Sequence, residues 1–129
     1  SKTRKKVIKL VKNLVENLPK SFNGEGILNH SPGYCELVNH KAQVDLIKRN
    51  CIDLFGKDSI KIIDKPSLGV EDFAYFLKEI PGAYFRLGCG NKEKGIVKDG
   101  HDPYFKIDEN CLKIGVQIQL KNILESLNE

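Results

Sequence analysis

The sequence lacks any run of apolar residues that approaches the roughly 20 needed to cross a bilayer. It also shows no signal peptide, so we expect neither a membrane partner nor secretion. Methionine is absent as well, and the chain begins with Ser1-Lys2-Thr3 directly at a predicted helix start. We therefore expect further sequence upstream of Ser1.

Paired cysteines and a strong charge of one sign are missing too. The four cysteines form no Cys-x-x-Cys pair, which favours reduced, partly buried thiols in a cytoplasmic protein. The net charge is only +4, and basic and acidic residues are interspersed along most of the chain. The one dense basic cluster, residues 2–6, is more typical of a solvated helix end than of a nucleic-acid surface, so we expect no nucleic-acid partner.

What the sequence does contain is the balance of a globular protein, with 40% hydrophobic and 29% charged residues in a chain of 129. Apolar residues recur at helical spacing over residues 7–18, 44–55 and 112–127. A shorter helix is predicted to run through Leu77. These patterns predict four helices.

The ends of these helices carry recognisable signals. Thr3 is predicted to be the N-cap of the first helix, and Pro19 to close it. Gly56 stands where the C-terminal cap of the second helix belongs, and Asp108 precedes the last helix as its cap.

Short strands are predicted at residues 26–30, 60–63 and 83–87. Residues 1–65 then read helix, strand, helix, strand, which is most of a ferredoxin-like αβ sandwich. Such a remnant would leave apolar surface and strand edges exposed, which again indicates a fragment. Pro66 marks a domain boundary.

His101 is the most informative residue for function. It lies in the long glycine-containing loop of residues 88–103, beside Pro103. A loop imidazole can bind a divalent metal through one nitrogen while a neighbouring acceptor holds the other nitrogen. A lone loop histidine is more often structural, however, and no second ligand stands at metal-site spacing.

Glu71 and Asn39 are weaker candidates. Glu71 opens a helix, where free backbone amides stabilise an acidic side chain, so helix capping competes with substrate contact. Asn39 is a natural turn or N-cap residue before the second helix. Cys89, His30 and His40 favour structural roles.

Four segments match one protein family in order and spacing. They are Tyr-Cys-Glu-Leu-Val-Asn at 34–39, Gly-Val-Glu-Asp-Phe-Ala-Tyr-Phe at 69–76, Pro-Gly-Ala-Tyr-Phe-Arg-Leu-Gly-Cys-Gly at 81–90 and His-Asp-Pro-Tyr-Phe-Lys-Ile-Asp-Glu at 101–109. Together they resemble the metal-dependent aminoacylase and carboxypeptidase family, in its hippurate hydrolase-like, N-acyl-amino-acid amidohydrolase branch.

The resemblance implies an α+β fold with a ferredoxin-like lid domain, which dimerises, and an α/β metallopeptidase catalytic domain. Residues 1–65 would be the latter part of the lid, and residues 66–129 the C-terminal part of the catalytic domain. His101 would bind one of two divalent metal ions, while Glu71 and Asn39 would contact the substrate.

The implied activity is metal-dependent hydrolysis of the amide bond of N-acyl amino acids or small peptides, with zinc, manganese, cobalt or nickel as the metal. The general base and the other metal ligands would lie upstream of Ser1, so we expect the chain to be inactive alone. Two departures stand out: Cys35 replaces the usual lid proline, and Gly100 replaces an apolar residue before His101.

Two other classes of function stay open at this point. A small-molecule-binding regulatory domain would explain residues 1–65 but not the His101 loop. A nucleic-acid-binding module would use residues 2–6 and would bind with a steep dependence on salt.

Overall fold

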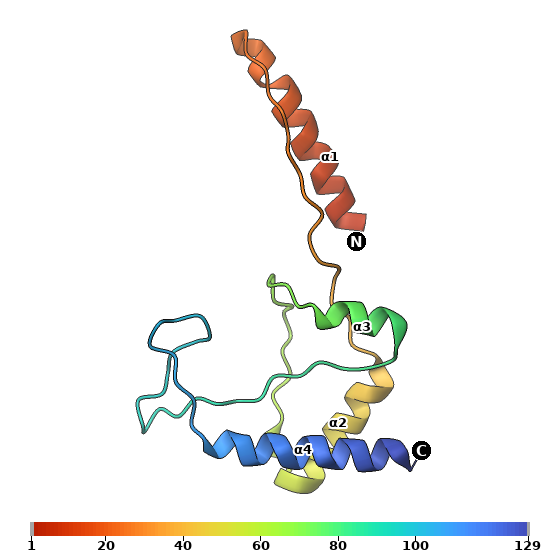
Figure 1. Ribbon diagram of the computed structural model, residues 1–129, viewed down its shortest axis with the longest axis vertical. Helices are drawn as coiled ribbons and strands as arrows, with labels where there is room; N and C mark the ends of the chain where they lie inside the picture. Colours follow the sequence, from red (N-terminus) through yellow and green to blue (C-terminus); the bar gives the residue numbers. More distant parts are fainter. Residues whose placement is uncertain (1, 129) are drawn as a thin grey trace.

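A computed structural model describes residues 2–128 of the chain. All four predicted helices are confirmed, and two short 3-10 helices accompany them (Figure 1). In chain order the elements are α1 (Lys2–Asn17), η1 (Pro19–Phe22), α2 (Lys41–Phe55), η2 (Lys57–Ser59), α3 (Phe73–Glu79) and α4 (Asn110–Leu127).

Some of the predicted helix ends are confirmed. Gly56 ends α2 with a φ of 82°, a conformation that favours glycine, and its N–H donates to the Ile52 carbonyl oxygen at 2.8 Å. The N-cap of α4 is Glu109 and not the predicted Asp108, although the Asp108 carboxylate accepts the N–H of Asn110 at the start of the helix. The assignment of Thr3 as an N-cap is wrong, because α1 already includes Lys2 and Thr3 lies inside its first turn.

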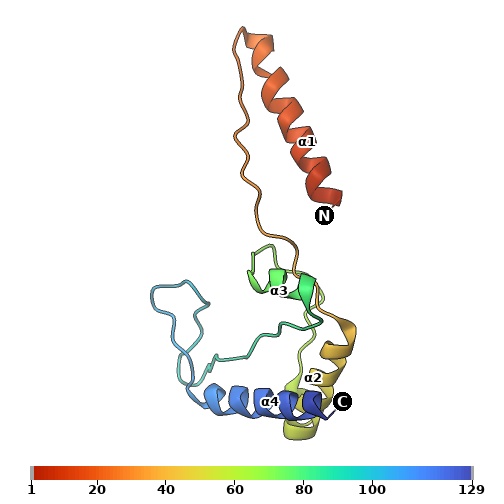
Figure 2. The ribbon, with the colours of Figure 1, turned by 45° about the vertical axis from the view of Figure 1, so that its right-hand side comes forward.

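α1 lies apart from the other three helices in both views (Figures 1 and 2). None of its residues is buried, and the predicted apolar stripe is open to solvent, with Leu14 62% exposed. The extended segment of residues 24–40 runs back along α1 and leads to α2. At the end of this segment the Tyr34 ring meets the Tyr75 ring of α3 edge-on, with centroids 5.8 Å apart.

Gly26 allows the returning segment to approach α1 closely. A methyl group at this position would overlap the carbonyl oxygen of Val15, which is backbone and cannot rotate away. We expect Gly26→Ala to destabilise the contact between segment and helix by about 1–3 kcal/mol, the usual cost of overpacking. Amide hydrogen exchange of α1 should accelerate. Gly33→Ala is the matched control because nothing lies within 4 Å of its added methyl group, and equal effects of both changes would contradict the account.

The packed part of the molecule is built around the crossing of α2 and α4. Leu46 and Cys51 of α2 are buried, as are Cys111 and Ile118 of α4. The fully buried Asn50 donates from its side-chain amide to the Asn122 side-chain oxygen at 2.9 Å. This bond links the two helices, and a buried polar group that lost its partner would cost about 1–3 kcal/mol.

The apolar stripe predicted for α4 is not the face that packs. Its residues are 53–78% exposed, while the buried and half-buried positions lie on another face of the helix. The exposed residues are Leu112, Val116, Leu120, Ile123, Leu124 and Leu127. An apolar face of this length is usually covered in a native protein.

The three predicted strands are not formed within residues 2–128. Those segments are free of helix, but a strand requires a hydrogen-bonded neighbour, and the one β-bridge in the described part joins Asn91 to Ile96. Residues 83–90 nevertheless alternate between half-buried and exposed, which is the periodicity of a strand with one packed face. The ferredoxin-like arrangement of residues 1–65 therefore stays a prediction.

The predicted domain boundary at residues 65/66 also stays a prediction. α2 belongs to the first predicted domain and α4 to the second, yet they pack directly against each other. The helix that stands apart is α1, together with the segment that follows it (Figure 2).

Candidate functional site

Asn39 is placed by a pair of hydrogen bonds to the backbone of Tyr84. Its side-chain amide donates to the Tyr84 carbonyl oxygen, and its side-chain oxygen accepts the Tyr84 N–H, both at 2.8 Å. A carboxamide that donates and accepts at one residue imitates the edge of a neighbouring strand. Asn39 thus fixes the backbone of the segment at 82–84. It does not cap α2, whose N-cap is His40.

His40 strengthens the same junction. Its backbone N–H donates to the Gly82 carbonyl oxygen at 3.0 Å, and its ring nitrogen Nδ1 accepts the Gly82 N–H at 3.2 Å. An imidazole held in this way is structural, as the sequence favoured.

Glu71 stands where the loop before α3 ends. One of its carboxylate oxygens, Oε1, accepts the N–H of Phe73 at 3.3 Å, which agrees with the helix-capping interpretation. The Glu71 carboxylate beside the Tyr84 hydroxyl raises the pKa of Tyr84 above its usual value, mainly as a hydrogen-bond acceptor for the phenol; partial burial and the repulsion between the two negative charges add to the shift, and Arg86 opposes it.

Tyr84 therefore links two of the predicted site residues. Its backbone is bound by Asn39, and its hydroxyl lies beside the Glu71 carboxylate that raises its pKa. In the sequence Tyr84 stands out only as the aromatic residue of the Pro-Gly-Ala segment, and no role was predicted for it. The signal available was that this aromatic residue is a tyrosine, whose phenol carries a hydrogen-bonding group that the ring of a phenylalanine lacks.

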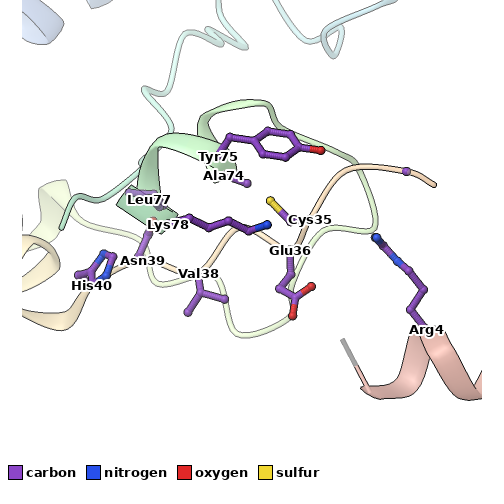
Figure 3. A pocket seen from close by; sticks show the side chains of 11 residues that line it. Arg4, Cys35, Glu36, Val38, Asn39, His40, Ala74, Tyr75, Leu77 and Lys78 are labelled. Atoms are coloured by element: carbon purple, nitrogen blue, oxygen red, sulfur yellow. The ribbon is translucent and has the colours of Figure 1, made fainter. Parts of the chain in front are cut away.

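A hollow of about 620 Å³ lies beside Asn39 and His40, below α3 (Figure 3). Lys78 and Glu36 bring charge to its wall, and the half-buried Cys35 lies there too. Arg4, from α1, faces it from the other side. Neither Glu71 nor His101 lines this hollow.

His101 lies in an exposed turn of the loop between the segment at 83–90 and α4. Its φ is 75°, in the left-handed region that residues other than glycine seldom adopt. The Asp102 N–H donates to the Asp99 carbonyl oxygen at 3.2 Å, and the Asp102 carboxylate accepts the Tyr104 N–H at 2.8 Å. Unusual backbone held by such bonds is a recurrent feature of functional loops.

The structure does not bring His101 together with Glu71 and Asn39. The loop at 91–104 and the loop at 66–72 are separate in both views (Figures 1 and 2). Within residues 2–128 no group of three or more His, Cys, Asp or Glu side chains could hold a metal ion. One imidazole is too few for a catalytic metal site, which takes about three protein ligands. The described residues do not form such a site by themselves.

Asp108 fastens the base of the His101 loop. Its carboxylate accepts from the Asn91 amide at 2.6 Å and from the Lys94 ammonium at 3.1 Å, and its N–H donates to the Cys89 carbonyl oxygen. Asn91 and Ile96 exchange two backbone hydrogen bonds of 2.8 Å, which closes the turn between them. The loop that carries His101 is therefore anchored at both ends.

This anchor should weaken in acid. The hydrogen bonds from Asn91, Lys94 and Asn110 lower the pKa of Asp108 below its usual value of 3.8. A lowered pKa in the folded state gives stability above pH 3.8 that is lost as the pH falls through the lowered value. The protection of the Asn91 and Ile96 amides against hydrogen exchange, relative to their intrinsic exchange rate at each pH, should fall over that range. Asp108→Asn should remove this pH dependence, and a variant that kept it would contradict the assignment.

A comparison with known families gives a match over most of the chain. Residues 25–125 match the family model described as peptidase family M20/M25/M40. The chain belongs to this family. The match covers the segments that contain Asn39, Glu71 and His101, and it confirms the resemblance inferred from the four sequence motifs.

Several curated relatives of the M20/M25/M40 family are similar to this chain. A probable hydrolase of Synechocystis is 33% identical over 107 residues, which is 82% of this chain and 27% of the relative. An IAA-amino acid hydrolase of Arabidopsis thaliana is 34% identical over 74% of this chain and 20% of its own length. Thermostable carboxypeptidase 1 of Saccharolobus solfataricus is 47% identical over 64% of this chain and 20% of its own length.

This M20 chain thus spans between a fifth and about a quarter of the length of these relatives. No solved structure matches it. Among residues 2–128, no helix is both long enough and apolar enough to span a membrane.

Proposed function

We propose that the complete gene product containing this chain is a metal-dependent amidohydrolase that cleaves N-acyl amino acids. The observation that carries the proposal is the family match over residues 25–125. The printed names of the relatives support it, because an IAA-amino acid hydrolase and a carboxypeptidase are both named for hydrolysis at a bond to an amino acid.

In this proposal His101 supplies one metal ligand, and Glu71 and Asn39 contact the substrate. The exposed position and the unusual backbone of His101 support its role, because an imidazole on an anchored loop can meet ligands from elsewhere in the protein. The remaining ligands and the general base come from other parts of the gene product. Zinc, manganese, cobalt and nickel all suit imidazole and carboxylate ligands, and two such ions are proposed.

The proposed architecture follows the same family. Residues 1–65 would contribute to a ferredoxin-like lid through which the protein forms a homodimer, and residues 66–129 to the α/β catalytic domain. The exposed apolar side chains of α1 support this, since they would need covering in the complete protein. We propose a cytoplasmic location.

The test is direct. The purified gene product, supplied with divalent metal, should release free amino acid from N-acetyl and N-benzoyl amino acids, measured by reaction of the new amine. Esters of the same N-acyl amino acids, in which the carboxylate is blocked, define whether a free carboxylate belongs to the substrate class. Failure to hydrolyse any member of an N-acyl amino acid panel would defeat the proposal.

A further inference from the structure

The extended segment at 82–87 has one occupied edge. In extended backbone the N–H and C=O groups of one residue point to the same edge, and successive residues alternate between the two edges. Gly82 and Tyr84 therefore share an edge. Both backbone groups of Gly82 are hydrogen-bonded to His40, and both backbone groups of Tyr84 are hydrogen-bonded to Asn39. The chain that enters α2 thus covers this edge as a neighbouring strand would.

The opposite edge is open. It belongs to Ala83, Phe85 and Leu87, whose backbone N–H and C=O groups make no hydrogen bond within residues 2–128. All three residues are half-buried, and buried backbone groups in native proteins are nearly always paired. An open edge of this kind is a template on which another extended segment can pair.

The same segment lies on α4. A hollow of about 400 Å³ is lined by side chains from both elements, including Ala83, Phe85 and Leu87 on one side and Gly115 and Gln119 on the other. The approach is close, because a methyl group added at Gly115 would lie 2.9 Å from the Cδ2 atom of Leu87. The segment is therefore the beginning of a layer over α4.

This layer can extend over α4 in one direction only. The face of α4 that packs on α2 contains Cys111, Ile118 and Asn122. The open apolar stripe of α4 consists of Leu112, Val116, Leu120, Ile123, Leu124 and Leu127. At about 100° per residue, Gly115 and Gln119 lie between these two faces. Because the occupied edge of the segment leads into α2, its open edge faces the apolar stripe.

We propose that the open edge at 83–87 and the apolar stripe of α4 form one docking surface for a β-strand from the part of the gene product outside residues 1–129. The strand pairs with the open backbone groups, and the side chains on one of its faces cover the stripe. Since the stripe is wholly aliphatic, that strand carries apolar residues at alternate positions.

The size of the relatives supports this choice of occupant. The chain spans only 20–27% of their lengths, so a protein of that size has ample sequence to supply the strand. The inference goes beyond the proposed reaction and does not depend on it, because it rests on backbone groups and on the packing of α4.

The first test identifies the occupant. In the complete gene product, benzoylphenylalanine is incorporated at position 120 and activated by light, and the cross-linked peptide is mapped by mass spectrometry. We expect a peptide from outside residues 1–129, within a product that has the mass of one chain. Position 117, an exposed glutamine off the stripe, is the control and should not yield this peptide. A peptide from within residues 1–129, a product with the mass of two chains or no cross-link at position 120 would overturn the proposal.

The second test measures pairing at the open edge. In the complete gene product, the amides of Phe85 and Leu87 should exchange at least about 100-fold more slowly than their intrinsic rates, because a hydrogen bond between strands must open before its amide exchanges. Exchange of both amides at the intrinsic rate would show that no strand pairs there and would refute the inference.

The third test measures coverage of the stripe. Leu120→Lys places an unpaired charge under the docked strand, so the Tm of the complete gene product should fall by about 5 °C or more. Gln117→Lys is the matched control on the same helix, and its Tm should change by less than about 2 °C. Equal Tm values for the two variants would contradict the proposed coverage.

Hydrolysis enters none of these tests, so the two possible failures are distinguishable. If the gene product hydrolyses no N-acyl amino acid, the proposed function fails, and the cross-link at position 120 still decides the docking surface. If the protein is active and the cross-link is negative, the proposed function stands and this inference falls.

Discussion

Replacing His101 by alanine in the complete gene product should lower the affinity for one metal ion and the rate of hydrolysis by at least about 100-fold. The expected size follows from general experience with metal sites, where loss of even an outer partner of a ligand costs about 10–100-fold in affinity or activity. Metal per chain should be measured by elemental analysis after dialysis, and kcat/KM on an N-acyl amino acid.

His101 has a φ of 75°, so alanine would change the strain of the loop as well as remove the imidazole. His101→Gly separates these effects, because glycine adopts this conformation without strain. It should lose metal as fully as His101→Ala while keeping the loop in place. His30→Ala, in the exposed segment at 24–40, should retain metal. Stoichiometric metal in both His101 variants would refute the ligand assignment.

The second large effect concerns the 129-residue chain on its own. We expect it to show no hydrolysis of N-acyl amino acids above the rate in buffer, because one imidazole provides one of the several ligands that a catalytic metal requires. It should also bind no pair of divalent ions.

This comparison is best made with matched molar amounts of the chain and of the complete gene product. Isothermal titration with zinc and manganese reports binding, and amine release reports turnover. Measurable turnover by the 129-residue chain would show that a working site forms within it, and the proposal that its other ligands lie elsewhere would be abandoned.

The helices were predictable from the sequence because their signals are local. The apolar spacing of α2, the glycine at position 56 and the aspartate at position 108 all act within a few residues. The face of α4 that packs was not predictable, because it depends on contacts such as the Asn50–Asn122 hydrogen bond, whose partners are 72 residues apart in the sequence. Asn122 reads as a polar surface residue unless its partner is known.

The three predicted strands are not formed, for a related reason. A β-branched or alternating run favours extended backbone, but a strand exists only when a second segment accepts its hydrogen bonds. Residues 83–90 have the alternating burial without the ladder, so the pattern predicted their exposure and not their pairing.

The candidate site was predictable residue by residue but not as an arrangement. Family motifs indicated Asn39, Glu71 and His101, yet they carried no information on Tyr84, which joins the first two. They also could not indicate that the side-chain N–H and the side-chain oxygen of Asn39 both form hydrogen bonds with the backbone. That role leaves Asn39 less capacity for substrate than the motif implied.

Removal of metal from the complete gene product tests the central claim most directly. After treatment with a strong chelator and desalting, hydrolysis of an N-acyl amino acid should fall to the rate in buffer, and addition of zinc, manganese, cobalt or nickel should restore it. Full hydrolysis by protein that retains less than about one metal ion per ten chains, well below the occupancy that a metal-dependent site requires, would contradict the account.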